Sequence, residues 1–144
     1  MRVLIVNGPN LNLLGERQPE IYGAQSFEEF LQELREKFRG IQIAYYQSNV
    51  EGELINALHA ARLNQDAVIL NAGGYTHTSV ALGDAVAAIS IPVVEVHISN
   101  ILAREEFRHK SFISQHAAGI ISGFGLMGYE LALNYLERRL NGRQ

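Results

Sequence analysis

The chain has no cysteine among its 144 residues, which excludes disulfides, thiolate metal sites and a cysteine nucleophile. Because this composition suits a reducing compartment, we expect a cytoplasmic protein. The net charge is −3 and no lysine- or arginine-rich run occurs, so we expect no nucleic-acid partner. The first apolar run, Met1 to Val6, is too short for a signal-peptide core or a membrane span, so we expect no membrane association.

Repeats, linkers and low-complexity tracts are also absent. Hydrophobic residues make up 47% of the chain and charged residues 19%, which is typical of a globular domain with a sizeable core. The sequence therefore predicts a single domain over residues 1–144.

Apolar runs alternate with amphipathic segments along the chain. We predict strands at Arg2 to Asn7, Ile41 to Gln47, Ala67 to Asn71, Pro92 to Ile98 and Gly119 to Ser122. We predict helices at Ser26 to Phe38, Gly52 to Asn64, Ser79 to Ile89 and Leu126 to Leu140. This alternation favours an α/β fold, an open parallel sheet in a three-layer sandwich with right-handed crossovers. We choose the flavodoxin-like strand order 2-1-3-4-5, which places a site at the carboxyl ends of strands 1 and 3, beside strand 4.

A long segment rich in Gly, Pro and Asn follows the first strand and is too long for a simple turn. It carries Arg17 and Tyr22 between Gly15 and Gly23, whose backbone freedom suits a moving lid. An arginine beside a phenol can make tyrosine a base. The next helix begins at a capping box, in which Ser26 and Glu29 are expected to bond each other's free backbone N–H groups.

The third strand ends at Asn71 and runs into Ala-Gly-Gly-Tyr-Thr-His77. Turn chemistry alone also explains Asn71 and the glycines, with Ser79 or Thr78 capping the following helix. His77, however, lies at the mouth of a parallel sheet just before a helix, where it is well placed to bond a ligand.

The fourth strand carries Glu95, His97 and Ser99 on one face, because side chains alternate along a strand. A buried carboxylate needs a partner, and His97 lies two residues away on the same face. A carboxylate behind an imidazole fixes its tautomer. The pair is either a structural ion pair or, at the carboxyl end of the strand, a general acid or base.

The five histidines show no metal-ligand spacing and have no acidic cluster beside them, so we expect no metal.

Gly123-Phe-Gly125-Leu-Met-Gly128 matches a dinucleotide fingerprint, but the chain stops sixteen residues later, before the acidic residue that such a unit needs. We interpret these glycines as a tight turn and close packing of a last helix whose apolar face contains Leu126, Leu133, Leu136 and Leu140.

A charged segment, Arg104-Glu-Glu-Phe-Arg108, follows the fourth strand. Such a cluster is usually a solvated helical turn with local ion pairs. On a helix, however, Arg104 and Arg108 would share a face, which is mildly destabilising without an anionic or oxygen-rich partner. This hints at a role in a site.

Five motifs, in order from the first strand to the last helix, together resemble the type II 3-dehydroquinate dehydratases. The motifs are Asn7-Gly-Pro-Asn10-Leu, Gly15-x-Arg17-x-Pro-x-x-Tyr22-Gly, Asn71-Ala-Gly-Gly-Tyr-Thr-His77-Thr-Ser, Glu95-Val-His97-Ile-Ser99 and Arg104-Glu-Glu-Phe-Arg108. The resemblance implies a flavodoxin-like catalytic domain and a dodecamer built as four trimers. It also implies the substrate, 3-dehydroquinate, which loses water to give 3-dehydroshikimate in the shikimate pathway by anti elimination through an enolate.

The resemblance also implies roles for individual residues. Tyr22 resembles the base that takes a proton from the carbon next to the ketone, and Arg17 the lid cation that helps it ionise. His97, oriented by Glu95, resembles the acid that protonates the departing hydroxyl, and Asn10 the residue that holds a water against the enolate. The substrate contacts would be Asn71, Ile98 and Ser99 for the carboxylate and a hydroxyl, His77 and Arg108 for the ring hydroxyls, and Asp84 reaching from a neighbouring subunit.

Elementary chemistry agrees with these assignments. Lowering a tyrosine pKa from about 10 to about 7 needs about 4 kcal/mol, and one cation about 4 Å away in a partly desolvated site supplies that much. Schiff-base chemistry needs a buried lysine, whereas Lys37 and Lys110 both lie in charged segments. An acid–base elimination needs no organic cofactor, so we expect none.

A binding or signalling module of the same topology is the alternative class. A phosphoacceptor receiver needs acidic residues at the ends of strands 1 and 3, where this chain has Asn7, Asn10 and Asn71. A flavin-binding module would give a yellow protein.

Overall fold

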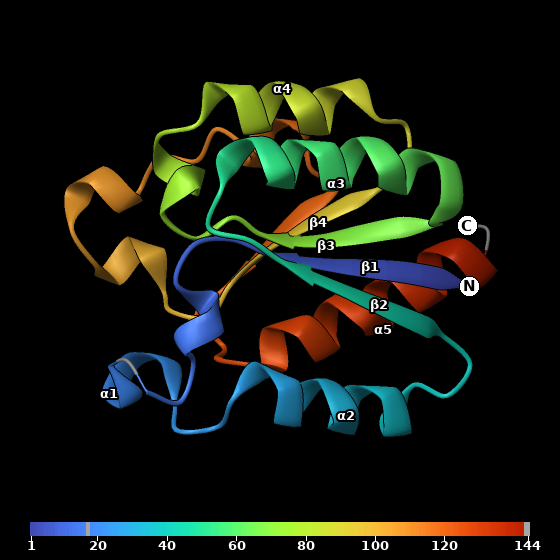
Figure 1. The fold of residues 1–144 in the computed structure, drawn as a ribbon, viewed down its shortest axis with the longest axis horizontal. Helices are drawn as coiled ribbons and strands as arrows, with labels where there is room; N and C mark the ends of the chain where they lie inside the picture. Colours follow the sequence, from blue (N-terminus) through green and yellow to red (C-terminus); the bar gives the residue numbers. More distant parts are fainter. Residues whose placement is uncertain (17, 143–144) are drawn as a thin grey trace.

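The five strands form one parallel sheet in the predicted order, β2-β1-β3-β4-β5 (Figure 1). The structure is a computed structural model that describes residues 1–16 and 18–142, except for the side chain of Tyr22. The strands are β1 Arg2–Asn7, β2 Gln42–Gln47, β3 Ala67–Asn71, β4 Val93–His97 and β5 Gly119–Ser122. The helices are α1 Pro19–Tyr22, α2 Phe27–Lys37, α3 Glu51–Asn64, α4 Val80–Ala88 and α5 Met127–Gly142.

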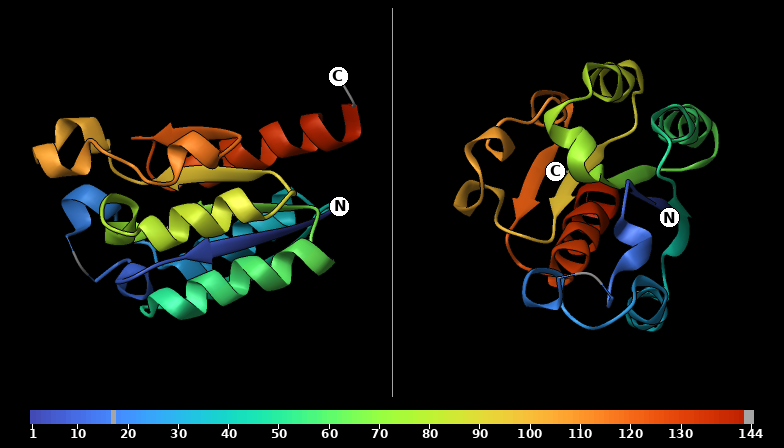
Figure 2. Two further views of the ribbon diagram at one scale, coloured as in Figure 1. Left: turned by 90° about the horizontal axis from the view of Figure 1, so that it is seen from above. Right: turned by 60° about the vertical axis from the view of Figure 1, so that its left-hand side comes forward.

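Helices cover both faces of the sheet, which gives the predicted three layers. Figures 1 and 2 show α3 and α4 on one face and α2 and α5 on the other. Each face therefore has its own apolar core, one around Leu54, Leu58 and Leu82 and the other around Phe27 and Leu133. The buried positions recur every three or four residues in α2, α3 and α5, as an amphipathic pattern requires.

The predicted helices and strands agree with the observed ones to within two residues at each end. Ser26 is the N-cap of α2, and its Oγ accepts a hydrogen bond from the Glu29 N–H at 3.2 Å. The expectation for the capping box is only half met, because the Glu29 carboxylate accepts from the Ser26 hydroxyl at 2.9 Å. Ser79 rather than Thr78 caps α4, accepting from the Leu82 N–H at 2.9 Å.

The interpretation of the glycine-rich motif after β5 as packing is confirmed. Gly123 has a φ of +98°, which favours glycine, in the turn between β5 and α5. A Cβ on Gly128 would lie 3.2 Å from the Val96 side chain, so this glycine lets α5 pack closely on β4. Leu133 and Leu136 are buried in the core beneath the sheet, with Leu126 and Leu140 packed against it.

Short helical turns crowd the carboxyl edge of the sheet, at the left of Figure 1. α1 lies there, within the long loop after β1, and Gly15 and Gly23 have positive φ on either side of it. The described residues also form the 3-10 turns η1 Leu11–Leu13, η2 Gly73–His77, η3 Ile101–Ala103, η4 Glu106–Arg108 and η5 Ser114–His116, the last of which packs against α4. Because Asn7 pairs with Asn71 and Leu70 with Glu95, the polar ends of β1, β3 and β4 are neighbours.

Over residues 1–16 and 18–142, no helix combines the length and the apolar character that crossing a membrane requires.

Candidate active site

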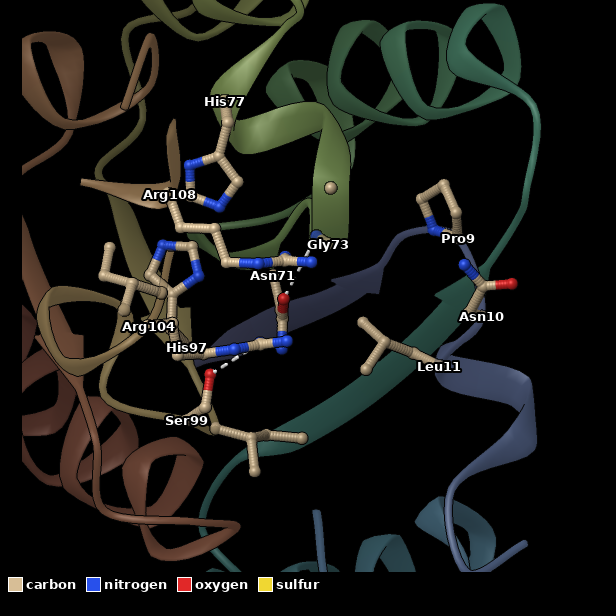
Figure 3. A pocket seen from close by; sticks show the side chains of 13 residues that line it. Pro9, Asn10, Leu11, Asn71, Gly73, His77, His97, Ser99, Arg104 and Arg108 are labelled. Carbon is tan, nitrogen blue, oxygen red and sulfur yellow. Dashed lines mark hydrogen bonds between the residues drawn. The ribbon is translucent and has the colours of Figure 1, made fainter. Parts of the chain in front are cut away.

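A pocket opens at the carboxyl edge, where β1, β3 and β4 end, and Figure 3 shows its side chains converging from these strands and from η2. Its cavity volume is about 120 Å³, below the range of about 300–1,000 Å³ that is usual for drug-sized ligands, so it suits a small molecule. Its lining is mostly polar. It consists of Pro9, Asn10, Leu11, Asn71, Gly73, Gly74, His77, His97, Ile98, Ser99, Ile101, Arg104 and Arg108.

His97 and Glu95 form a buried pair on β4. The His97 Nε2 donates to Glu95 Oε2 at 2.5 Å, and the two side chains are only 5% and 1% exposed. The alternate residues of β4, Val94 and Val96, point to the opposite face and lie in the apolar core, as the predicted alternation requires. Because Nε2 faces the carboxylate, Nδ1 is the ring nitrogen of His97 left to bond a ligand.

Two serines also hold the Glu95 carboxylate. Ser114 Oγ donates to Oε1 at 2.6 Å, and Ser111 Oγ lies 2.9 Å from Oε2 and 3.1 Å from Oε1. Burial raises the pKa of Glu95, but the hydrogen bonds from His97, Ser114 and Ser111 outweigh it, so the pKa lies below the ordinary value. The carboxylate therefore stays ionised behind His97.

His77 on η2 faces the same pocket, and its ring centroid lies 6.2 Å from that of His97. Its Nδ1 donates to the Lys110 carbonyl at 2.8 Å. Burial lowers the pKa of His77, and the charges of His97 and Arg108 lower it further, against the opposite effects of the Lys110 carbonyl and Glu95. A neutral His77 with its proton on Nδ1 offers Nε2 as an acceptor, which suits a ligand hydroxyl.

Asn71 is fixed by a buried network beneath the pocket. Its Oδ1 accepts from the Gly73 N–H at 3.2 Å, and its Nδ2 donates to the Tyr129 hydroxyl at 2.9 Å. Tyr129, on α5, donates in turn to Asn7 Oδ1 at 2.8 Å. Tyr129 is fully buried, and this burial raises the pKa of its phenol far above the usual value. It therefore stays neutral and serves as a rigid donor and acceptor.

Two arginines form the outer wall of the pocket, and Figure 3 shows both beside His97. Arg104 Nη1 donates to Ser99 Oγ at 3.1 Å. Glu105 lies between the arginines, 3.0 Å from Arg108 Nε and 3.7 Å from Arg104 Nε. This carboxylate offsets their repulsion. The helix considered for this segment is not formed, because Arg104 is extended between the turns η3 and η4.

Asn10 lies on the opposite wall, with a left-handed backbone at φ 70°. Asparagine tolerates this conformation better than most residues. Its N–H donates to Asn49 Oδ1 at 3.0 Å, which ties the start of the long loop to the segment after β2.

Comparison with known proteins identifies the family. The family model named Dehydroquinase class II matches residues 1–137 of the chain. This chain belongs to the class II dehydroquinase family.

Individual class II dehydroquinases and related enzymes are similar over nearly the whole chain. The 3-dehydroquinate dehydratase of Dinoroseobacter shibae is 56% identical over 93% of this chain and 91% of its own length. The 3-dehydroquinate dehydratase of Prochlorococcus marinus is 49% identical over 96% of this chain and 99% of its own length. The crystal structure of the type II dehydroquinase from Butyrivibrio crossotus is 43% identical and superposes with a TM-score of 0.92, over 95% of this chain and 97% of that one.

In this class II dehydroquinase, most of the residues singled out from the sequence come together. Glu95 lies behind His97. The other predicted residues that line the pocket, together with His97, are Asn10, Asn71, His77, Ile98, Ser99 and Arg108. Asp84 does not line it, because it is exposed on the outer face of α4. Arg17 and the side chain of Tyr22 lie outside the described part of the chain.

Sequence reasoning missed Ser111, Ser114 and Tyr129. The two serines lie 16 and 19 residues from the carboxylate that they bond, and Tyr129 lies 122 residues from Asn7. No local pattern links residues so far apart. The Ser-x-x-Ser spacing was the available signal for the serines, but it predicts a turn rather than a contact with β4.

Within the part of the chain that the structure describes, no three His, Asp or Glu side chains are grouped so as to hold a metal ion.

Proposed function

We propose that this protein dehydrates 3-dehydroquinate to 3-dehydroshikimate, a step of the shikimate pathway. Membership of the class II dehydroquinase family supports the reaction, since relatives about half identical to this chain are named 3-dehydroquinate dehydratase. The observation that carries the proposal is the buried pair of Glu95 and His97, whose imidazole opens on a polar pocket. An ionised carboxylate behind an imidazole makes a positioned proton donor.

The proposed elimination is anti and passes through an enolate. Tyr22, ionised with the help of Arg17, removes a proton from the carbon next to the ketone, and the electron pair of the broken C–H bond forms the enolate. Asn10 holds a water against the enolate oxygen. The enolate then collapses to a carbon–carbon double bond as the C–O bond breaks, and His97, oriented by Glu95, protonates the departing hydroxyl to give water. Side chains alone move these protons, so the proposal includes no cofactor and no metal.

The remaining pocket residues are proposed to hold the substrate. Asn71, the backbone of Ile98 and Ser99 and the Ser99 hydroxyl would contact the carboxylate and a hydroxyl. His77 and Arg108 would hold the ring hydroxyls, with the His77 Nε2 accepting as its protonation requires. Asp84 would act from a neighbouring subunit.

A labelled substrate tests the reaction and its geometry together. We would prepare 3-dehydroquinate with deuterium in one of the two positions on the carbon next to the ketone, and follow the ultraviolet absorbance of the enone product. Turnover should release the deuterium that is anti to the leaving hydroxyl and retain the other. No enone at millimolar substrate would contradict the activity, and loss of the syn deuterium would contradict the placement of base and acid on opposite sides.

A further inference from the structure

The Glu95 carboxylate is held by more than the imidazole that it orients. Both of its oxygens accept side-chain hydrogen bonds from Ser111 and Ser114, in addition to the bond from His97. We propose that Ser111 and Ser114 are positioning residues, which hold the Glu95 carboxylate against His97 and set how readily His97 releases its proton. This inference rests on the proposed role of His97 as the acid of the dehydration.

The serines leave the carboxylate little freedom. Oε1 accepts from Ser114 at 2.6 Å, while Oε2 accepts from His97 at 2.5 Å and lies 2.9 Å from the Ser111 hydroxyl. Because Glu95 is only 1% exposed, water cannot easily replace a missing donor. The serines therefore fix which oxygen faces the imidazole.

The same bonds also affect the proton affinity of the pair. When His97 gives up its proton, the buried Glu95 carboxylate loses the positive charge of its imidazolium partner. Hydrogen bonds to a carboxylate are strongest when its charge is not neutralised, so the serines stabilise the deprotonated pair more than the protonated one. This matches the lowered pKa of Glu95, to which both serines contribute. The serine hydrogen bonds therefore favour release of the proton from the Glu95–His97 pair.

Both serines belong to a well-anchored segment, Lys110 to Ser114, which we call the strap. The Lys110 carbonyl accepts from His77 Nδ1 at 2.8 Å, and the Phe112 N–H donates to the Thr76 carbonyl at 2.9 Å. A Cβ on Gly83 of α4 would lie 2.3 Å from the Phe112 carbonyl oxygen, so glycine is needed for the strap to lie this close to α4. One segment therefore orients both His77 and Glu95.

Other charged and titratable groups surround the pair and must stay constant in any test. Among the described side chains they are His77 on η2, Arg104 and Arg108 in the pocket wall, Glu105 between those arginines, and His109 and Lys110 at the start of the strap. Substituting a serine hydroxyl leaves all of them in place. A change in the titration of His97 then reports on the serine bonds.

Ser114→Ala is the cleaner substitution. The Ser114 hydroxyl bonds to Glu95, whereas the Ser111 hydroxyl also accepts from the Ile113 and Ser114 N–H groups. We would measure the pH dependence of kcat and, without substrate, the titration of the His97 imidazole by NMR. We expect the alkaline limb of the kcat–pH profile and the midpoint of the His97 NMR titration each to move to higher pH by about 0.5 to 1 unit. We also expect kcat to fall a few-fold, because the acid is weaker.

Two variants control for general disturbance. Ser122→Ala removes a hydroxyl from β5, directly opposite His97 in the sheet, but that hydroxyl bonds to backbone groups of Ser99 and Ile101. It should leave the His97 titration in place. Ser114→Thr keeps the hydroxyl and should restore the wild-type titration. If Ser114→Ala does not fold, Ser114→Cys, with its weak S–H donor, takes its place.

A shift of less than about 0.5 pH unit, or a downward shift, would overturn the positioning role, since loss of packing alone changes kcat or KM without moving the titration. The NMR measurement needs no turnover. A wild-type protein that does not dehydrate 3-dehydroquinate would therefore contradict the proposed function, while the His97 titration would still decide whether the serines tune the pair.

Discussion

At the scale of single residues, the candidate site is built around a carboxylate and an imidazole two positions apart on β4. The strand period places them on one face, and burial to 1% and 5% exposure forces them to bond each other. Because the pair is proposed as the acid, the proposed elimination also needs a base on the other side of the substrate. The long loop after β1 carries Tyr22, proposed as this base, and Arg17, proposed as the cation that helps Tyr22 ionise.

Removing the phenol hydroxyl tests the base. Tyr22→Phe keeps the shape of the ring, so it should fold normally and lose several orders of magnitude in kcat. Circular dichroism and thermal unfolding provide the control for folding. A variant that turns over at nearly the wild-type rate would remove Tyr22 from the mechanism.

Removing the guanidinium tests the activating cation. Arg17→Ala should lose most of the activity, chiefly in kcat, and should raise the apparent pKa of the basic group in the pH profile, because a nearby cation lowers the pKa of a phenol. Arg17→Lys should rescue only in part, since a point charge replaces a planar fork. An effect on KM alone would make Arg17 a binding residue only.

At the scale of elements, α5 supports the site from below although it contributes nothing to the pocket lining. Tyr129 comes from its first turn and packs edge-on against Phe27 of α2, with ring centroids 5.0 Å apart. Its hydroxyl bonds both Asn7 and Asn71, at the ends of β1 and β3. The last helix thus holds two neighbouring strand ends in register with the pocket.

Tyr129→Phe should therefore affect both stability and binding. Leaving Asn7 Oδ1 and Asn71 Nδ2 without their buried partner should cost about 1–3 kcal/mol of unfolding free energy. Freed on one side, the Asn71 amide should also bind substrate less well, which raises KM more than it lowers kcat. Denaturant unfolding and steady-state kinetics measure the two effects.

The matched control is Tyr135→Phe, on the same helix but 40% exposed. It should change neither quantity appreciably. If Tyr129→Phe behaved like this control, the network would not support the site.

The elements were the part of the molecule most open to prediction. Five apolar runs fix the strands. Their alternation with amphipathic segments leaves few parallel topologies, which is why the sheet order and the helix layer on each face of the sheet could be predicted. The period of β4 likewise predicts the Glu95–His97 pair. The helical turns after β4 could not be predicted, because the contacts of Arg104 and Arg108 with Ser99 and Glu105 override the local pattern. Tyr129 and the two serines depend on long-range packing that a pattern does not encode.

At the scale of the whole molecule, the outer face of α4 remains exposed in the single chain. Val80 is 56% exposed, and Asp84 is exposed beside small apolar residues. We predict that this face lies at a subunit interface within a trimer, with Asp84 paired there by a cation or hydrogen-bond donor. We further predict a dodecamer of four such trimers.

Subunit mixing tests this prediction sharply. If Asp84 completes a neighbour's site, a mixture of Asp84→Ala chains and His97→Ala chains, unfolded and refolded together, should regain activity that neither has alone. Some sites in that mixture combine an intact His97 with an intact neighbouring Asp84. A mixture no more active than the sum of its parts, or a monomer in solution with full activity, would contradict the assignment.

The most direct test of the central claim is kcat for 3-dehydroquinate in the His97→Gln variant, measured by enone absorbance. Glutamine keeps a polar side chain against Glu95 but cannot deliver a proton to the leaving hydroxyl. If His97 is the acid, kcat should fall by about 10²–10⁴-fold while KM changes little. A kcat within tenfold of the wild-type value would contradict the account.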